Sequence, residues 1–221
     1  MADVYIVSVG INNDGQFGDS VPIIIDENRA IPDNERQALA VELQAPETVF
    51  INSKTDADIS IMHSQGEVDF AGVPALAAAH FLAGIKQDPV TVIKSRGGNI
   101  RVTFEDDKVW VAAKLDKMPP WNLQQLAGAA DVEAIQIGDT SQWEHTMVWA
   151  WLDEDKGRVR SRTFANDWNI PEAPANGSGS MLLAAKLNKK VEIIHGVGTV
   201  LYARPIDEWN AEIGAHVSSS S

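Results

Sequence analysis

Glu47 is the side chain in this sequence with the clearest capacity for acid–base chemistry. It follows Pro46, which ends a predicted helix, and it opens the predicted strand Glu47–Ile51. A carboxylate placed at the mouth of a strand can remove a proton from a substrate and return it. The alternative interpretation is that Glu47 is a solvated surface carboxylate, as most glutamates in loops are.

Two glycine-containing turns lead into apolar segments, and together they could bind an anion. The first lies in Glu67–Gly84, where Gly72 and a proline precede an almost wholly apolar helix. The pattern returns about a hundred residues later in Glu172–Leu187, with Gly177 and Ser178 in the turn. A helix N-terminus presents free N–H groups and a partial positive charge, so two of them across one cleft would bind a carboxylate. The simpler interpretation is that each turn only connects a strand to a packed helix.

Other kinds of catalytic chemistry find little support in the residue types. The chain has no cysteine, which excludes disulfides, thiolate nucleophiles and zinc–thiolate sites. The histidines lack metal-ligand spacing, so we expect no metal. No phosphate-binding loop, dinucleotide fingerprint or nucleophile elbow is present. The five histidines are His63, His80, His145, His195 and His216.

The composition indicates a globular protein and disfavours two classes of partner. Asp and Glu outnumber Lys and Arg by 31 to 18, which gives a net charge of −13. Nucleic acid and anionic membrane surfaces recruit clustered Lys and Arg, so neither is expected as a partner. No apolar run approaches the ~20 residues of a membrane span, and the N-terminus lacks a signal-peptide pattern. We therefore expect a cytoplasmic protein.

The elements that must position these residues are short strands, and they are repeated. Strands separated by tight turns are typical of an antiparallel meander. The second half of the chain replays the first with an offset near one hundred, and a period this long that occurs only twice indicates a duplicated domain. Three aligned pairs illustrate the offset: Ile59 and Val159, Pro74 and Pro174, Val90 and Val191.

We therefore predict an α+β fold of two duplicated domains, residues 1–116 and 117–217. Each would be an antiparallel, barrel-like sheet curled around its own apolar helix, because this covers the helix and limits open edges. The linker falls near Met118–Pro120, and the second domain is expected to begin with a helix over Leu123–Ala129 and a strand over Glu133–Ile137. The serine-rich residues 218–221 are expected to form a disordered tail.

Four segments of the chain resemble the phenazine-biosynthesis PhzF family, which has the diaminopimelate-epimerase fold. That fold implies two similar barrel-like domains, each enclosing a helix, with the active site between them. Members of the family are commonly homodimers, so the resemblance implies a homodimer here. The segments are PETVF (Pro46–Phe50), EVDFAGVPALAAAHFL (Glu67–Leu82), RSRTFANDWNIPEAPANGSG (Arg160–Gly179) and HGVGTVLYARP (His195–Pro205).

The resemblance also implies a site. Glu47 matches the catalytic glutamate of the family's S-E-T-x-F pattern, which is thought to move a proton between carbon positions of a small carboxylate without metal or cofactor. An early F-x-G-N-P element of the family is degraded to Phe17–Ser20 in this chain, and the resemblance implies that Asp19 lies at the substrate. The two helix turns, G-H-P-T and E-D-P-A-T-G-S-A in the family, imply substrate contacts from Gly72, Val73, Ala173, Gly177 and Ser178.

Two of these positions depart from the family pattern. The histidine and the aspartate that would assist Glu47 are replaced by Val73 and Ala173. A positioned acid–base group contributes typically ~10²–10⁴-fold to a rate, so the loss of two bears directly on activity. A more apolar pocket should also raise the pKa of Glu47. Two hypotheses follow: an isomerase or epimerase that acts through Glu47, or a catalytically impaired relative that binds a small molecule or serves as a dimeric interaction protein.

Overall fold

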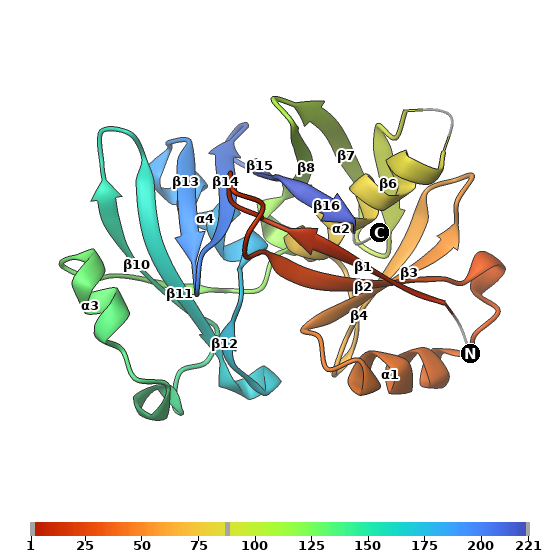
Figure 1. Cartoon of the computed structure of the whole chain (residues 1–221), viewed down its shortest axis with the longest axis horizontal. Helices are drawn as coiled ribbons and strands as arrows, with labels where there is room; N and C mark the ends of the chain where they lie inside the picture. Colours follow the sequence, from red (N-terminus) through yellow and green to blue (C-terminus); the bar gives the residue numbers. More distant parts are fainter. Residues whose placement is uncertain (1–2, 87–88, 220–221) are drawn as a thin grey trace.

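The computed structural model describes residues 3–86 and 89–219, whose strands form one continuous mixed sheet. Figure 1 shows this sheet folded into two lobes, one holding α1 and α2 and the other α3 and α4. The strands of the first half are β1 (Val4–Val9), β2 (Asp19–Ile25), β3 (Glu47–Ser53), β4 (Asp58–His63), β5 (Gly66–Val68), β6 (Val92–Ser95), β7 (Gly98–Glu105) and β8 (Lys108–Lys114).

The second half contributes eight more strands and two of the four α-helices. Its strands are β9 (Asn122–Gln125), β10 (Thr146–Asp153), β11 (Arg158–Ala165), β12 (Ile170–Ala173), β13 (Val191–His195), β14 (Thr199–Pro205), β15 (Asn210–Ala215) and β16 (Val217–Ser219). The helices of the chain are α1 (Asp33–Glu42), α2 (Gly72–Ile85), α3 (Ala129–Ala134) and α4 (Gly177–Leu187), with short 3₁₀ turns η1 (Glu27–Arg29), η2 (Leu115–Lys117), η3 (Ile137–Thr140) and η4 (Asn166–Trp168).

The prediction of purely antiparallel sheets is wrong for four strand pairs. The pairs β2–β3, β4–β6, β9–β10 and β11–β13 run parallel. Each pair brackets one α-helix in the chain, from α1 to α4 in that order. A parallel pair needs a crossover that returns the chain to the same end of the sheet, and these four helices provide it. The remaining pairs are antiparallel, many of them hairpins.

Strands from the end of the chain close the sheet of the first half at both of its sides. Strand β15 pairs with β8 from Asn210↔Lys114 to Ala215↔Val109. Strand β16 pairs with β1, so Ser218 and Ser219 are backbone partners within the sheet. The predicted disordered tail is therefore wrong for these two serines, whose main-chain groups pair regardless of their small side chains. Residues 220–221 lie outside the described residues.

Two buried helices meet at their N-termini. In α2, all residues from Gly72 to Ala79 are buried, and the helix packs against β1, β2, β3 and β8. Helix α4 packs against β14 and β15. A Cβ atom added to Gly177 would lie only 2.9 Å from the Cα of Gly72, so the two helix starts are in backbone contact. The predicted offset of one hundred residues between the two halves is not kept at these helices. Pro74 lies inside α2, whereas Pro174 precedes α4.

The start of the second half also differs from prediction. The predicted helix over Leu123–Ala129 is wrong for its first three residues, which belong to strand β9, and β9 pairs in parallel with β10. The predicted strand over Glu133–Ile137 overlaps the end of α3. The backbone N–H of Gly128 donates to the Asp131 carboxylate over 2.9 Å and so begins this helix. Val132 then packs in a small apolar cluster on the outer face of the sheet.

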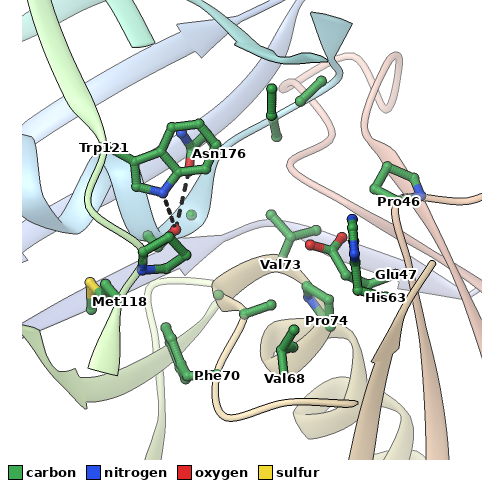
Figure 2. Close-up of a pocket in the computed structure, with 18 of the residues that line it drawn as sticks. Pro46, Glu47, His63, Val68, Phe70, Val73, Pro74, Met118, Trp121 and Asn176 are labelled. Atoms are coloured by element: carbon green, nitrogen blue, oxygen red, sulfur yellow. Dashed lines mark hydrogen bonds between the residues drawn. The ribbon is translucent and has the colours of Figure 1, made fainter. Parts of the chain in front are cut away.

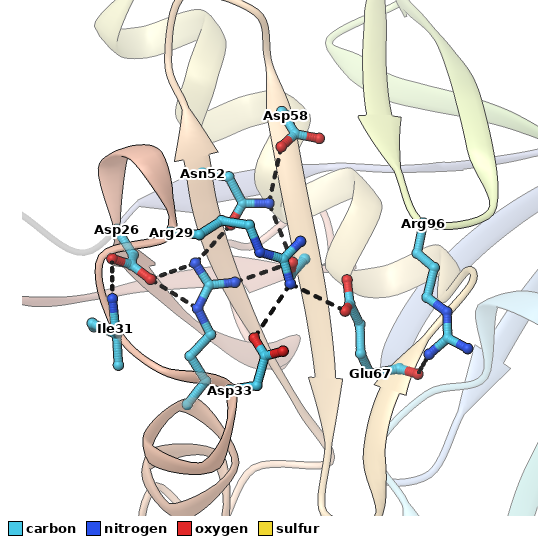
Figure 3. Close-up of polar contacts among 10 residues, drawn as sticks. Asp26, Arg29, Ile31, Asp33, Asn52, Asp58, Glu67 and Arg96 are labelled. Atoms are coloured by element: carbon cyan, nitrogen blue, oxygen red, sulfur yellow. Dashed lines mark hydrogen bonds and ion pairs between the residues drawn. The ribbon is translucent and has the colours of Figure 1, made fainter.

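A buried polar cluster fixes α1 against the outer face of β2, β3 and β4 (Figure 3). The fully buried Arg36 guanidinium binds the Asp26 carboxylate and donates to Asn52 Oδ1 over 2.9 Å and to Ser60 Oγ over 3.2 Å. A buried ion pair is tolerated when further hydrogen bonds satisfy it, as they do here. From the same helix, Gln37 donates to the carbonyl oxygen of His63 over 2.9 Å and so holds the end of β4.

Among the described residues, every helix is too short or too polar to cross a membrane.

Candidate active site

A cavity of about 350 Å³ lies where the two halves meet, and all the residues predicted from the sequence line it. Figure 2 shows Glu47 and His63 on one side and Trp121 and Asn176 on the other, with Val73 between them. The seven predicted residues along its wall are Asp19, Glu47, Gly72, Val73, Ala173, Gly177 and Ser178.

Strand β3 positions Glu47. The next five residues of the strand are buried, so the strand is anchored while its first residue reaches the cavity. Burial and, to a smaller extent, the neighbouring negative charge of Asp19 raise the pKa of Glu47 to about 8. The prediction of a raised pKa is confirmed. A carboxyl with a pKa near neutrality can exchange a proton in either direction, as a general acid or a general base does.

Asp19 supplies a second carboxyl to the same wall. It opens strand β2 and is only 6% exposed. Burial raises the pKa of Asp19 to about 7, against the opposing effect of a hydrogen bond from the Ser20 backbone. Two neighbouring carboxyls that resist ionisation titrate as a pair. The cavity can therefore hold one proton between Asp19 and Glu47 close to neutral pH.

The helix starts form the opposite, electropositive wall. Within the described residues no side chain caps the start of α2. At α4, Asn176 Oδ1 accepts the Gly179 N–H over 2.8 Å, and the Ser178 hydroxyl accepts the Trp121 indole N–H over 2.8 Å. The Asn176 amide nitrogen is buried and has no partner in the part of the chain that the structure describes. Unpaired N–H groups at the positive ends of two helices are suited to bind an anion.

An aromatic wall completes the cavity. The rings of His63 and Trp168 have centroids 4.9 Å apart, and Trp121 meets Trp168 edge-on at 6.1 Å. His145 supports both tryptophans from behind and bonds to Asp167, with 3.1 Å between His145 Nδ1 and the carboxylate. A flat or cyclic ligand fits such a wall because aromatic faces favour stacked and edge contacts.

The sequence predicts no role at the site for Trp121, Trp168 or Asn176, and it offers His63, with His145, only as an alternative in case proton transfer does not depend on Glu47. A signal was present for Asn176, because Asn is a preferred N-cap and it directly precedes the Gly177–Gly179 turn. Trp121 follows the proline-containing linker, where no sequence pattern indicates which way its side chain points. Its role depends on the packing of the two halves.

Two other features are outside the site. Ser180 Oγ and His195 Nε2 lie 3.0 Å apart, but both residues are buried and neither lines the cavity. Burial and, to a smaller extent, the nearby Arg160 charge lower the pKa of His195 to about 3, so this pair stays neutral within the core. Among the described residues, no group of three or more His, Asp or Glu side chains is arranged to hold a metal ion.

Solved structures place the fold among PhzF proteins and proline-type epimerases. A PhzF-family protein from Enterococcus faecalis is 16% identical, with a TM-score of 0.76 over 99% of this chain and 98% of that one. A putative PhzC/PhzF protein from Clostridium difficile is 17% identical, with a TM-score of 0.76 over 100% and 98%. A hydroxyproline epimerase from Agrobacterium vitis, with bound trans-4-OH-L-proline, is 13% identical, with a TM-score of 0.61 over 99% and 90%. At these identities the likeness concerns the fold.

A comparison of the sequence with family models assigns the chain to a family. Residues 13–152 match the sequence model of the phenazine biosynthesis-like proteins, PhzC-PhzF, and the chain belongs to this family. No curated protein matches it.

Proposed function

We propose that this protein is a cofactor-independent isomerase or epimerase that moves a proton on a small carboxylate through Glu47. The observation that carries the proposal is that Glu47 and both helix starts line a single cavity. Membership of the PhzC-PhzF family supports a reaction of this general kind. The hydroxyproline and proline-type enzymes that share the fold are, by their names, epimerases and racemases.

The reaction can be followed atom by atom. The carboxylate of the substrate binds at the N-termini of α2 and α4, which line the cavity at Gly72 and Gly177. Ionised Glu47 takes a proton from a carbon atom next to the carboxylate or to a conjugated double bond, and the electron pair of that C–H bond spreads into the acceptor group. Protonated Glu47 then returns the proton to another carbon on the same face of the substrate, whereas inversion at the same carbon would take a proton from a second acid on the opposite face. The proton count is unchanged, and no electron leaves the substrate.

The second candidate is a catalytically impaired relative that binds a small molecule or another protein. The observation that favours it is the pair Val73 and Ala173. Both residues line the cavity, and neither can donate or accept a proton. In this alternative the helix starts bind the ligand. The ionisation of Glu47 and Asp19 then determines only the pH range in which the ligand binds.

We further propose that the two halves are duplicated units, each curled around one helix, α2 or α4. Supporting this, the pairing order β3–β4–β6–β7–β8 of the first half is matched by β10–β11–β13–β14–β15 in the second. The pairing register shifts between Ile51 and Ser53 in one half and between Trp151 and Asp153 in the other. A site at the seam of two such units would receive one helix start from each.

The test is deuterium exchange in heavy water. We would incubate the protein with small carboxylates that have an acidic or allylic C–H bond, namely L-proline, trans-4-hydroxy-L-proline and cyclohex-1-ene-1-carboxylate. Mass spectrometry should find deuterium at carbon with at least one of them. Glu47→Gln should abolish the exchange and leave ligand binding nearly unchanged, because it removes a step made only in the transition state.

The matched control is Glu35→Gln, which changes an exposed glutamate on α1 and should exchange like the parent protein. Exchange that persists in Glu47→Gln would move the chemistry to another residue. A carboxylate that binds without exchange in the parent protein would favour the binding-protein alternative.

A further inference from the structure

His63 is a cavity residue that the proposed reaction does not use. It ends strand β4 directly opposite Glu47, the first residue of β3, in the antiparallel register. Side chains of directly opposed residues emerge on the same face of a sheet. Both residues line the cavity, and Figure 2 shows them together on its wall. His63 is therefore placed beside the position at which Glu47 would meet a substrate.

The hydrogen bonds of His63 define its protonation state. Its Nδ1 accepts the backbone N–H of Gln65 over 3.3 Å. A ring nitrogen that accepts a hydrogen bond carries no proton, so the neutral ring has its N–H at Nε2. The residue is only 3% exposed, and Nε2 is buried without a partner among the described residues. A buried N–H donor therefore lies at the cavity wall with no acceptor from the protein.

The ring is held rigidly and stays neutral. Gln37 binds the carbonyl oxygen of His63, and Trp168 packs against the ring. The charged and titratable groups around it are Asp167 and His145 from the second half, with Glu47 opposite. Burial lowers the pKa of His63 and outweighs the opposing effect of Asp167, while His145 lowers the pKa further. A rigid, neutral donor is suited to bind an oxygen atom of a ligand.

We propose that His63 contacts the substrate and donates a hydrogen bond from Nε2 to an oxygen beside the carbon that Glu47 deprotonates. This proposal rests on the proposed function, because it takes the carboxylate of the ligand to lie at the helix starts. Those starts and Asn176 lie across Val73 from His63, so the oxygen at His63 belongs to a second group. A ligand that uses both contacts therefore needs an oxygen atom besides those of its carboxylate.

The first experiment measures binding by calorimetry, with benzoate as the reference probe and 3-hydroxybenzoate and 4-hydroxybenzoate as its oxygen-bearing partners. In the parent protein, one hydroxybenzoate should bind about five-fold tighter than benzoate, the gain expected from one neutral hydrogen bond. His63→Leu should remove this gain, measured within that variant as the ratio of the hydroxybenzoate affinity to the benzoate affinity. His63→Gln should keep part of the gain, because its amide N–H can reach a similar position.

His80→Leu is the matched control, since His80 does not line the cavity, and it should keep the full gain. An equal gain in His63→Leu overturns the proposal. The absence of any gain in the parent protein also overturns it, including the case in which neither probe binds.

The second experiment needs no variant. Nitrogen-15 NMR of the parent protein labelled at histidine should show His63 protonated at Nε2, and its Nε2–H signal should shift when the tighter hydroxybenzoate is added. Protonation at Nδ1, or a signal that does not respond, overturns the proposal. Neither experiment requires turnover, so failure of the deuterium exchange would contradict the proposed function without changing these results.

Discussion

Glu47 and Asp19 are two acids that the fold keeps from ionising. Their pKa values, about 8 and about 7, are raised mainly because burial removes water from the carboxyls. A group that holds a proton in the folded state and would release it when unfolded makes the stability of the protein depend on pH. The site therefore has a measurable thermodynamic signature that does not depend on knowing the substrate.

We predict that the parent protein loses stability relative to Glu47→Gln as the pH rises from about 4.5 to about 8. In this range the folded state keeps the Glu47 proton, whereas the unfolded state, with the ordinary pKa of 4.5, has released it. Because the folded state binds more protons, its free energy of unfolding falls as pH rises. The difference should reach at least about 1 kcal/mol, since each pKa unit corresponds to about 1.4 kcal/mol.

Urea unfolding across this pH range measures the effect. Glu35→Gln should follow the parent curve because Glu35 is exposed. Parallel curves for the parent protein and Glu47→Gln would show that Glu47 ionises in the fold as freely as it does in water.

At the scale of residues, the seven residues predicted from the sequence all line the cavity, because turns and family motifs leave local traces. The sequence predicted Glu47, Gly72 and Gly177 from their turns and neighbours. It did not predict that His63 would stand opposite Glu47, because the register of β3 against β4 is a non-local property. The burial of Asp19 likewise depends on packing between elements.

At the scale of elements, the two helix starts decide the shape of the site. The backbone of Gly72 touches that of Gly177, an approach that only glycine allows. This contact brings two positive helix ends to one place without a charged side chain. It also leaves the cavity sensitive to a single methyl group at either position.

We predict that Gly177→Ala destabilises the protein by about 1–3 kcal/mol, as overpacking in a core typically does. The new Cβ would lie 2.9 Å from Gly72 Cα and 3.1 Å from the Val73 nitrogen, and these backbone atoms cannot move aside without separating the helices. Binding of benzoate should weaken as well. Thermal unfolding and calorimetry would measure the two effects.

Gly84→Ala is the matched control. Gly84 lies in the last turn of α2 with no other atom close to an added Cβ. The helix propensity of alanine should raise stability there by roughly 0.5–1 kcal/mol. Equal effects of the two substitutions would mean that the helix starts do not need their close contact.

The sequence predicted most strands and the two buried helices at this scale, because apolar runs and turn residues are local signals. It failed on strand direction, since β2 and β3 look alike whether they run parallel or antiparallel. The crossover through α1 decides that question. It also failed at β9, where Asn122–Gln125 is a strand only because β10 lies beside it.

At the scale of the whole molecule, the two halves share one sheet. The pairing of β15 with β8, and of β16 with β1, gives the first half two of its neighbours from the end of the chain. The predicted domains 1–116 and 117–217 therefore describe a repeated pattern of elements that need not fold separately. Their cooperation can be tested by cutting the chain between them.

We predict that residues 1–116 alone do not form a stable fold, and that the full chain unfolds in a single cooperative transition. Without β15 and β16, strands β8 and β1 would be exposed edges, and the contact between α2 and α4 would be lost. Circular dichroism and NMR of the fragment would measure this. Adding residues 117–221 should restore structure, and cooperative melting of residues 1–116 alone would contradict the prediction.

The pairing of β8 with β15 also bears on how the chain folds during synthesis. When β8 leaves the ribosome, roughly 100 residues remain to be made before β15 follows, which takes about 5–20 s at about 5–20 residues per second. During that interval the nascent first half carries two open strand edges and a helix start without its counterpart. Chaperones that shield such edges would act on this protein in that interval, and residues 1–116 in solution reproduce the exposed intermediate they would meet.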